Sequence, residues 1–209
     1  MQSSKCKVVG LTGPIASGKN EVAKILRHFG AQVIDADEIG HKLLTPQSDA
    51  WRQIVKTFGS KVLMAGGKVN RKRLGEMVFG DRKLLKKLDR IMHPRIKDEI
   101  KSEIRNSKSE TNSKFQNKAN FKTKFIVINA ALLKEVGLIP LVDEVWVVTA
   151  PKAKRFGWLI KKGLTKEQAL ARINSQASDR TYSRIADVLI KNTGSMKKMK
   201  NSISRLFRT

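Results

Sequence analysis

Short apolar runs alternate with longer segments of helical periodicity along most of the 209-residue chain. In the longer segments, apolar residues recur three or four positions apart, as on one face of a helix. The short runs, which have the length and composition of strands buried on both faces, are residues 8–11, 32–34, 125–128, 145–148 and 188–190. Strands that alternate with helices are typical of a parallel sheet covered on both sides. We therefore predict an α/β fold with a five-stranded parallel sheet between helices.

The helical segments at the two ends of the pattern are clearly delimited. The first follows the first apolar run and is expected to stop at Gly30. Its apolar face comprises Val22, Ile25, Leu26 and Phe29. The last begins near residue 195, and its expected apolar side comprises Met196, Met199, Ile203 and Phe207.

The middle of the chain is mostly helical in pattern from residue 38 to residue 103, with a turn at 65–67. One apolar helical face there comprises Leu84, Leu85, Leu88, Ile91 and Met92. Residues 106–120 are rich in Lys, Asn and Ser, so we expect a flexible surface loop without a core of its own. The chain length and a hydrophobic content of 40% suit a single domain.

The segment between the first strand and the first helix has the spacing G-x-x-x-x-G-K, which is that of a phosphate-binding loop. Glycines allow backbone N–H groups to close around phosphate oxygens, and the helix N-terminus adds positive charge. The alternative, a glycine turn followed by a chance lysine, is disfavoured by the strand–loop–helix context. The predicted nucleotide-binding residues are Gly13, Pro14, Ile15, Ala16, Ser17, Gly18, Lys19, Asn20 and Glu21.

Asn20 occupies a position where such loops carry Ser or Thr, whose hydroxyl ligates Mg²⁺. An amide oxygen also ligates magnesium, directly or through water. Asn20 is therefore our candidate metal ligand. If its amide is a poor ligand, Asn20→Thr should lower the magnesium requirement; if neighbouring groups have adjusted to Asn20, the substitution should leave a gap.

Two aspartates directly follow the second strand, Asp35 and Asp37. The carboxyl ends of parallel strands share one sheet edge, where ligands bind, so both lie near the phosphate loop. Asp37 is the candidate base for an attacking hydroxyl. Asp35 either supports the site or caps the next helix. His93 precedes Pro94 and is expected to be structural or to contact substrate rather than to be catalytic.

The composition favours an anionic partner, because the formal net charge is +25. Aromatic residues that could stack on nucleic-acid bases make up only 6%, so weak non-specific nucleic-acid binding is favoured over a dedicated nucleic-acid role. A single cysteine excludes a disulfide framework. Without an apolar signal region or a bilayer-length apolar stretch, we expect a cytoplasmic protein with no membrane partner.

Motifs along nearly the whole chain resemble those of the dephospho-coenzyme A kinase family. The matching segments are Gly10-Leu11-Thr12-Gly13 with Ser17-Gly18-Lys19, Val33-Ile34-Asp35-Ala36-Asp37, His93-Pro94, Leu132-Leu133 with Glu135, Asp143, Gly163-Leu164-Thr165, Arg172-Ile173 with Gln176, and Ala186-Asp187-Val188-Ile190 with Asn192 and Gly194. The resemblance implies a P-loop kinase that transfers the γ-phosphoryl group of ATP, with Mg²⁺, to the ribose 3′-hydroxyl of dephospho-coenzyme A.

The resemblance also implies three parts. A nucleotide-binding core comprises residues 1–37 and 121–209, a helical substrate-binding region comprises residues 38–105, and a small lid lies near 152–165. The catalytic set that it implies is Lys19, Asp35, Asp37 and a basic lid group, with His93 as a substrate contact.

The chain departs from the family pattern at several site positions. Asn129 stands where an aspartate is common, and Ala131 replaces the usual proline. In the lid, Gly157 and Lys161 stand where arginines are usual. We take Lys161 as the catalytic lid group, with Arg155 and Lys162 as nearby substitutes. The alternatives are another small-molecule P-loop kinase and a catalytically weak paralogue that binds nucleotide or nucleic acid.

Overall fold

The computed structural model describes residues 6–79, 81–109 and 124–206. Within these residues, five parallel strands form one sheet in the order β2-β3-β1-β4-β5. The strands are β1 (Cys6–Thr12), β2 (Gln32–Asp35), β3 (Lys124–Asn129), β4 (Glu144–Thr149) and β5 (Val188–Lys191). Each contains one of the apolar runs predicted from the sequence, so the α/β prediction with a five-stranded parallel sheet is confirmed.

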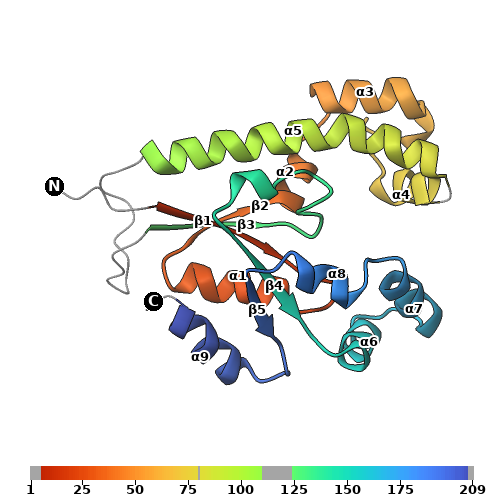
Figure 1. Cartoon of the computed structure of the whole chain (residues 1–209). Helices are drawn as coiled ribbons and strands as arrows, with labels where there is room; N and C mark the ends of the chain where they lie inside the picture. The colour runs from red at the N-terminus through yellow and green to blue at the C-terminus, as the bar shows by residue number, and fades with distance from the viewer. Residues whose placement is uncertain (1–5, 80, 110–123, 207–209) are drawn as a thin grey trace.

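The central strands are apolar on both faces because helices cover both sides of the sheet (Figure 1). Successive strand residues point to opposite faces, and in β3 Ile126 and Ile128 enter one core cluster while Val127 enters the other. Trp146, a fully buried residue of β4, lies on the same face as Val127. The lack of polar alternation in these strands is thus explained by burial of both faces.

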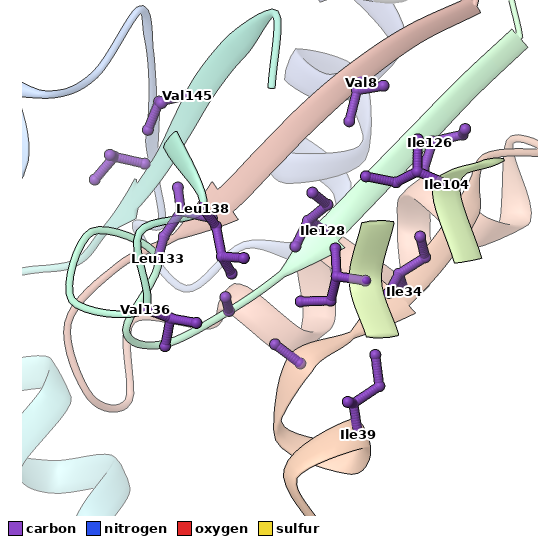
Figure 2. Close-up of a cluster of buried hydrophobic side chains, with 14 of the residues drawn as sticks. Val8, Ile34, Ile39, Ile104, Ile126, Ile128, Leu133, Val136, Leu138 and Val145 are labelled. Atoms are coloured by element: carbon purple, nitrogen blue, oxygen red, sulfur yellow. The ribbon is translucent and has the colours of Figure 1, made fainter. Parts of the chain in front are cut away.

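One face of the sheet is covered by α2 (Ala36–Lys42), α5 (Arg82–Ser109) and α8 (Asp179–Arg184), together with residues 130–142, which include the short 3₁₀ turn η2 (Ile139–Leu141). Figure 2 shows this cluster, in which Ile34, Ile126 and Ile128 of the strands face Ile104 of α5 and Ile39 of α2. This packing fixes the start of α2 directly against the sheet; of the two predicted aspartates, Asp35 ends β2 and caps the helix, and Asp37 lies in its first turn.

The opposite face is covered by α1 (Lys19–His28) and α9 (Met196–Leu206). Val22, Ile25 and Leu26 of α1 are buried as predicted, and the chain leaves the helix at Gly30 with φ 92°. In α9 the prediction was partly wrong, because Met199 and Ile203 are buried whereas Met196 is 45% exposed. Met196 is the first residue of the helix, where it extends beyond the edge of the core. Phe207 lies outside the described residues.

A helical region extends from the sheet and contains α3 (Asp49–Phe58), the 3₁₀ turn η1 (Ser60–Val62) and α4 (Arg71–Phe79), which pack on the first half of α5. The predicted turn at 65–67 is present. Ile91 and Met92 of the predicted apolar face are buried, but Leu85 is 36% exposed and faces a cavity described below. One helix, α5, therefore contributes to both the sheet core and this region.

The predicted loop at 106–120 begins too early, because α5 continues through residue 109. Ile104 is buried on the sheet core, and the Ser107 hydroxyl donates to the Glu103 carbonyl at 2.6 Å. A polar composition fits the exposed face of a helix as well as a loop, which explains the error. The rest of that prediction, residues 110–120, lies outside the described residues.

The remaining helices are α6 (Lys152–Lys161) and α7 (Lys166–Asn174), which form a helical pair beyond the end of β4. Thr165 starts α7 with a reciprocal capping box to Gln168. Among the helices that the structure describes, none combines the length and the apolar character needed to cross a bilayer.

Ile100 offers a direct test of the core packing between α5 and the sheet. Its side chain is fully buried, so Ile100→Ala should lower the free energy of unfolding by about 2–5 kcal/mol, and Ile100→Val by about 0.5–1.5 kcal/mol. The control, Leu170→Ala on the exposed surface of α7, should change it by less than about 0.5 kcal/mol. Urea denaturation measures all three; equal effects at Ile100 and Leu170 would contradict the packing described.

Candidate functional site

The loop between β1 and α1 is held in a conformation that only glycine tolerates at its two key positions. Gly13 has φ 155°, and a Cβ atom there would lie 2.2 Å from the Val148 carbonyl oxygen. Gly18 has φ 94°, and a Cβ atom there would lie 2.3 Å from Nδ2 of Asn192. Glycine is therefore required at position 13 by the close approach of a backbone carbonyl, and at position 18 chiefly by the left-handed backbone conformation.

Side chains from the C-terminal half of the chain hold this loop in place. Gln176 accepts a hydrogen bond from the Ile15 N–H at 2.6 Å, and Asn192 donates from Nδ2 to the Ser17 carbonyl at 2.9 Å. The sequence motifs included both residues, but we did not predict them as site residues. Their only sequence signal was their place in the family pattern, since nothing local marks a contact over more than 150 positions.

The loop forms one side of a cavity of about 330 Å³. Every residue predicted to bind nucleotide lines it, together with Asp37, Ala131, Lys162 and Gln176. The Ser17 hydroxyl, one of these groups, is buried without a hydrogen-bond partner among the described residues. A buried hydroxyl of this kind is costly unless a ligand satisfies it. The cavity therefore has the shape and the donors of a polyphosphate site.

Lys19 is buried at the base of this cavity, with 9% of its surface exposed. Its ammonium donates a hydrogen bond to Oδ1 of Asn129 at 2.7 Å, and Oδ2 of Asp37 lies 4.0 Å away. Burial lowers the pKa of Lys19, while the negative charges of Asp37 and Asp35 act in the opposite direction. Phosphate oxygens in the cavity would add negative charge and favour the charged ammonium.

Asp35 caps the N-terminus of α2, which is one of the two roles that the sequence analysis offered for this residue. Its Oδ1 accepts from the N–H groups of Asp37 and Glu38 at 3.0 and 3.2 Å. Its Oδ2 accepts from Nδ2 of Asn129 at 2.7 Å, so the second oxygen is also engaged. The cap directs the first turn of α2 toward the phosphate loop, and Asp37, 58% exposed at its side chain, projects into the cavity.

A second, larger cavity of about 550 Å³ opens beside the first, between α2, α4 and α5. Asp37 lines both cavities. The apolar side chains that line the second cavity include Leu44, Leu74, Val78, Leu85 and Met92. Its charged and titratable side chains are Asp37, His41, Arg71, Asp89 and His93. A carboxylate thus lies where the contents of the two cavities would meet.

His93 lies within α5, although a proline follows it directly. Its Nε2 is 3.3 Å from Oδ1 of Asp89, one helical turn away, and both side chains line the larger cavity. The ring is thus placed to contact a ligand there, and it is held by a neighbour. Two residues further along α5, the Arg95 guanidinium donates to the Ile91 carbonyl at 2.7 Å.

The basic residues of the expected lid are placed differently from one another. Lys162, which follows α6, lines the phosphate cavity, and Lys161 is not among the residues that line it. Arg155 is buried and donates to the Ala150 carbonyl and to both oxygens of Asp179, so it ties α6 to α8. The apolar core of α6 and α7 reaches Ile15 and Ala16 of the phosphate loop. Of the three basic residues, the structure therefore brings Lys162 to the cavity.

Comparisons of the sequence and of the structure with known proteins point to one family. A family model described as Dephospho-CoA kinase matches residues 7–198. The Dephospho-CoA kinase of Carboxydothermus hydrogenoformans is 38% identical over 94% of this chain and 90% of its own. That of Dehalococcoides mccartyi is 39% identical over 96% of both chains. The solved structure of Dephospho-CoA kinase from Campylobacter jejuni superposes with a TM-score of 0.68 at 27% identity, covering 96% of this chain and 95% of the other.

Proposed function

The chain belongs to the dephospho-CoA kinase family, and from this membership we propose that it transfers the γ-phosphoryl group of ATP to the 3′-hydroxyl of dephospho-coenzyme A. This reaction gives coenzyme A and is the final step of its biosynthesis. The observation that carries the proposal is the position of Asp37 between two adjoining cavities, one formed by the phosphate loop and one largely apolar.

The two cavities suit the two substrates. The smaller offers the loop N–H groups, the Ser17 hydroxyl and Lys19 to the phosphates of ATP. The larger offers apolar walls to the organic part of the acceptor and the Arg71 guanidinium to its phosphates. Phosphoryl transfer needs mainly positioning and charge neutralisation, and both are available where the cavities meet.

Asp37 is the proposed base. The acceptor hydroxyl attacks the γ-phosphorus, Asp37 takes the hydroxyl proton, and the bond to the β–γ bridging oxygen breaks to release ADP. Lys19, which lines the cavity, neutralises charge on the phosphates. Lys161 was expected to close over the transferring group; Lys162 is better placed for that role, because it already lines the cavity.

Magnesium would be held beside the phosphates by oxygen donors of this chain. Asn20 and Asp37 both line the cavity, and one or two side-chain oxygens together with phosphates and water are a common Mg²⁺ environment. When bound, the ion neutralises charge between the β- and γ-phosphates. Asn20 Oδ1 accepts from Nδ2 of Asn129 at 3.3 Å, so the amide oxygen is oriented by a neighbour.

The function is tested by ATP consumption with dephospho-coenzyme A, compared with shikimate, nucleoside monophosphates and no acceptor. We expect turnover with dephospho-coenzyme A alone.

Lys19→Ala should abolish that turnover and weaken ATP binding, with circular dichroism unchanged because Lys19 belongs to the cavity and not to the apolar core. Faster turnover with another acceptor would overturn the substrate assignment, and an active, folded Lys19→Ala variant would overturn the phosphate-loop mechanism.

Asp37→Asn should reduce kcat by about 10²–10⁴-fold, the loss typical of a positioned acid–base group. The KM for ATP should change little. Asp89→Asn is the matched control, because Asp89 is another carboxylate of the larger cavity but does not line the phosphate cavity. Steady-state kinetics of both variants decide the assignment; if Asp89→Asn lowers kcat as much as Asp37→Asn does, Asp37 is not the base.

Asn20→Thr tests how the site holds magnesium. The threonine hydroxyl is closer to the backbone than Oδ1 of Asn20, and because Oδ1 is already 3.3 Å from Nδ2 of Asn129, the hydroxyl would lie beyond hydrogen-bond distance of that group. This contact supports the view that the neighbourhood has adjusted to Asn20, so the variant should need an equal or higher Mg²⁺ concentration for half-maximal activity. A magnesium titration at fixed ATP measures it. A clearly lower half-saturation point would mean that Asn20 is the poorer ligand.

A further inference from the structure

We propose that Asn129 is a positioning residue for phosphoryl transfer, whose amide holds the phosphate-binding Lys19 and the aspartate that orients the base in one hydrogen-bonded unit. The inference rests on the proposed function. Asn129 lines neither cavity, so the role is not contact with substrate. It depends on what the side chain touches from beneath the site.

Asn129 has a particular place in the sheet. It is the last residue of β3, which lies between β1 and β2, and its register partners are Leu11 on one side and Asp35 on the other. The phosphate loop follows β1, while Asp35 ends β2 and Asp37 lies just beyond it. A side chain at this position is therefore the shortest connection between the two halves of the site, and at 2% exposure it is shielded from water.

The amide of Asn129 uses each of its polar functions. Its Oδ1 accepts from Nζ of Lys19 at 2.7 Å. Its Nδ2 donates to Oδ2 of Asp35 at 2.7 Å and to Oδ1 of Asn20 at 3.3 Å. An amide nitrogen carries two hydrogens, so these two bonds exhaust its donors. A neutral amide can accept from an ammonium and donate to a carboxylate at once, whereas an ionised carboxylate only accepts.

This unit sets the positions of both functional side chains. With Oδ2 fixed by Asn129, Asp35 presents Oδ1 to the N–H groups of Asp37 and Glu38, which fixes the first turn of α2 and with it Asp37. Lys19 is held 4.0 Å from Oδ2 of Asp37.

The first test is Asn129→Asp, which keeps the shape of the side chain but replaces the donor with an oxygen. That oxygen would face Oδ2 of Asp35 at the present 2.7 Å, so the two groups repel or share a proton. We expect kcat to fall by about 10²-fold, as for a small misplacement of reacting groups, with the KM for dephospho-coenzyme A within about twofold. ATP binding, measured by calorimetry without acceptor, should weaken. The control Asn201→Asp makes the same change on the exposed surface of α9 and should alter neither quantity.

The decisive test exchanges the two groups. In the double variant Asn129→Asp with Asp35→Asn, the amide at position 35 donates to the carboxylate at position 129, which still accepts from Lys19. Asparagine also caps helices well, so the bonds to Asp37 and Glu38 are retained. The total charge of the site equals that of the wild type. We expect the double variant to regain at least about tenfold in kcat and to recover ATP binding relative to Asn129→Asp, as restored positioning requires.

Each outcome has a definite meaning. Near wild-type kcat in Asn129→Asp, or a double variant no better than that single variant, overturns the proposal. A double variant that recovers only its melting temperature, and neither kcat nor ATP binding, also overturns it, because the unit would then be structural. Loss of the proposed function is separate: it would appear as a wild-type protein inactive toward dephospho-coenzyme A, and the ATP-binding series would still test the role of Asn129.

Discussion

The backbone pairing that places β3 between β1 and β2 is the constraint on which the site depends. Because the strands are parallel, their carboxyl ends meet at one edge of the sheet, and the register sets Asn129 beside both Leu11 and Asp35. The phosphate loop and the aspartates thereby start from adjacent points. The apolar packing on both faces holds this register, since a slip by one residue would turn each buried side chain to the wrong face.

A buried lysine is stable here because its neighbours compensate for lost hydration. Lys19 has an amide oxygen at hydrogen-bond distance and two carboxylates in its surroundings, yet burial still lowers the pKa of its ammonium. Desolvation of this kind is costly in the free protein and strengthens the attraction to phosphate when a ligand binds. The Ser17 hydroxyl is likewise buried, without a hydrogen-bond partner among the described residues, and a bound ligand would satisfy it.

The helical region supplies the second half of the site through one long helix. Helix α5 packs on the sheet near its C-terminal end and on α3 and α4 near its N-terminal end, so the larger cavity is fixed relative to the smaller one. On the other side, Arg155 fastens α6 to α8, while Lys162 reaches the phosphate cavity. The α3–α5 region and the α6–α7 pair are thus each held against the phosphate cavity by defined contacts. Asp37 lines both this cavity and the larger one.

The strands, the phosphate loop and the carboxylates at the end of β2 could be predicted because each depends on local spacing: apolar runs, glycines at positions with positive φ, and polar residues at strand ends. The partners of those residues could not. Lys19 and Asn129 are 110 positions apart, and only the order of the strands brings them together. The extension of α5 through residue 109 was not predicted, nor was it predicted which of the neighbouring residues Lys161 and Lys162 lines the phosphate cavity. A polar segment packs as readily on a helix surface as in a loop, and one step around a helix end redirects a side chain, so tertiary packing alone decides both.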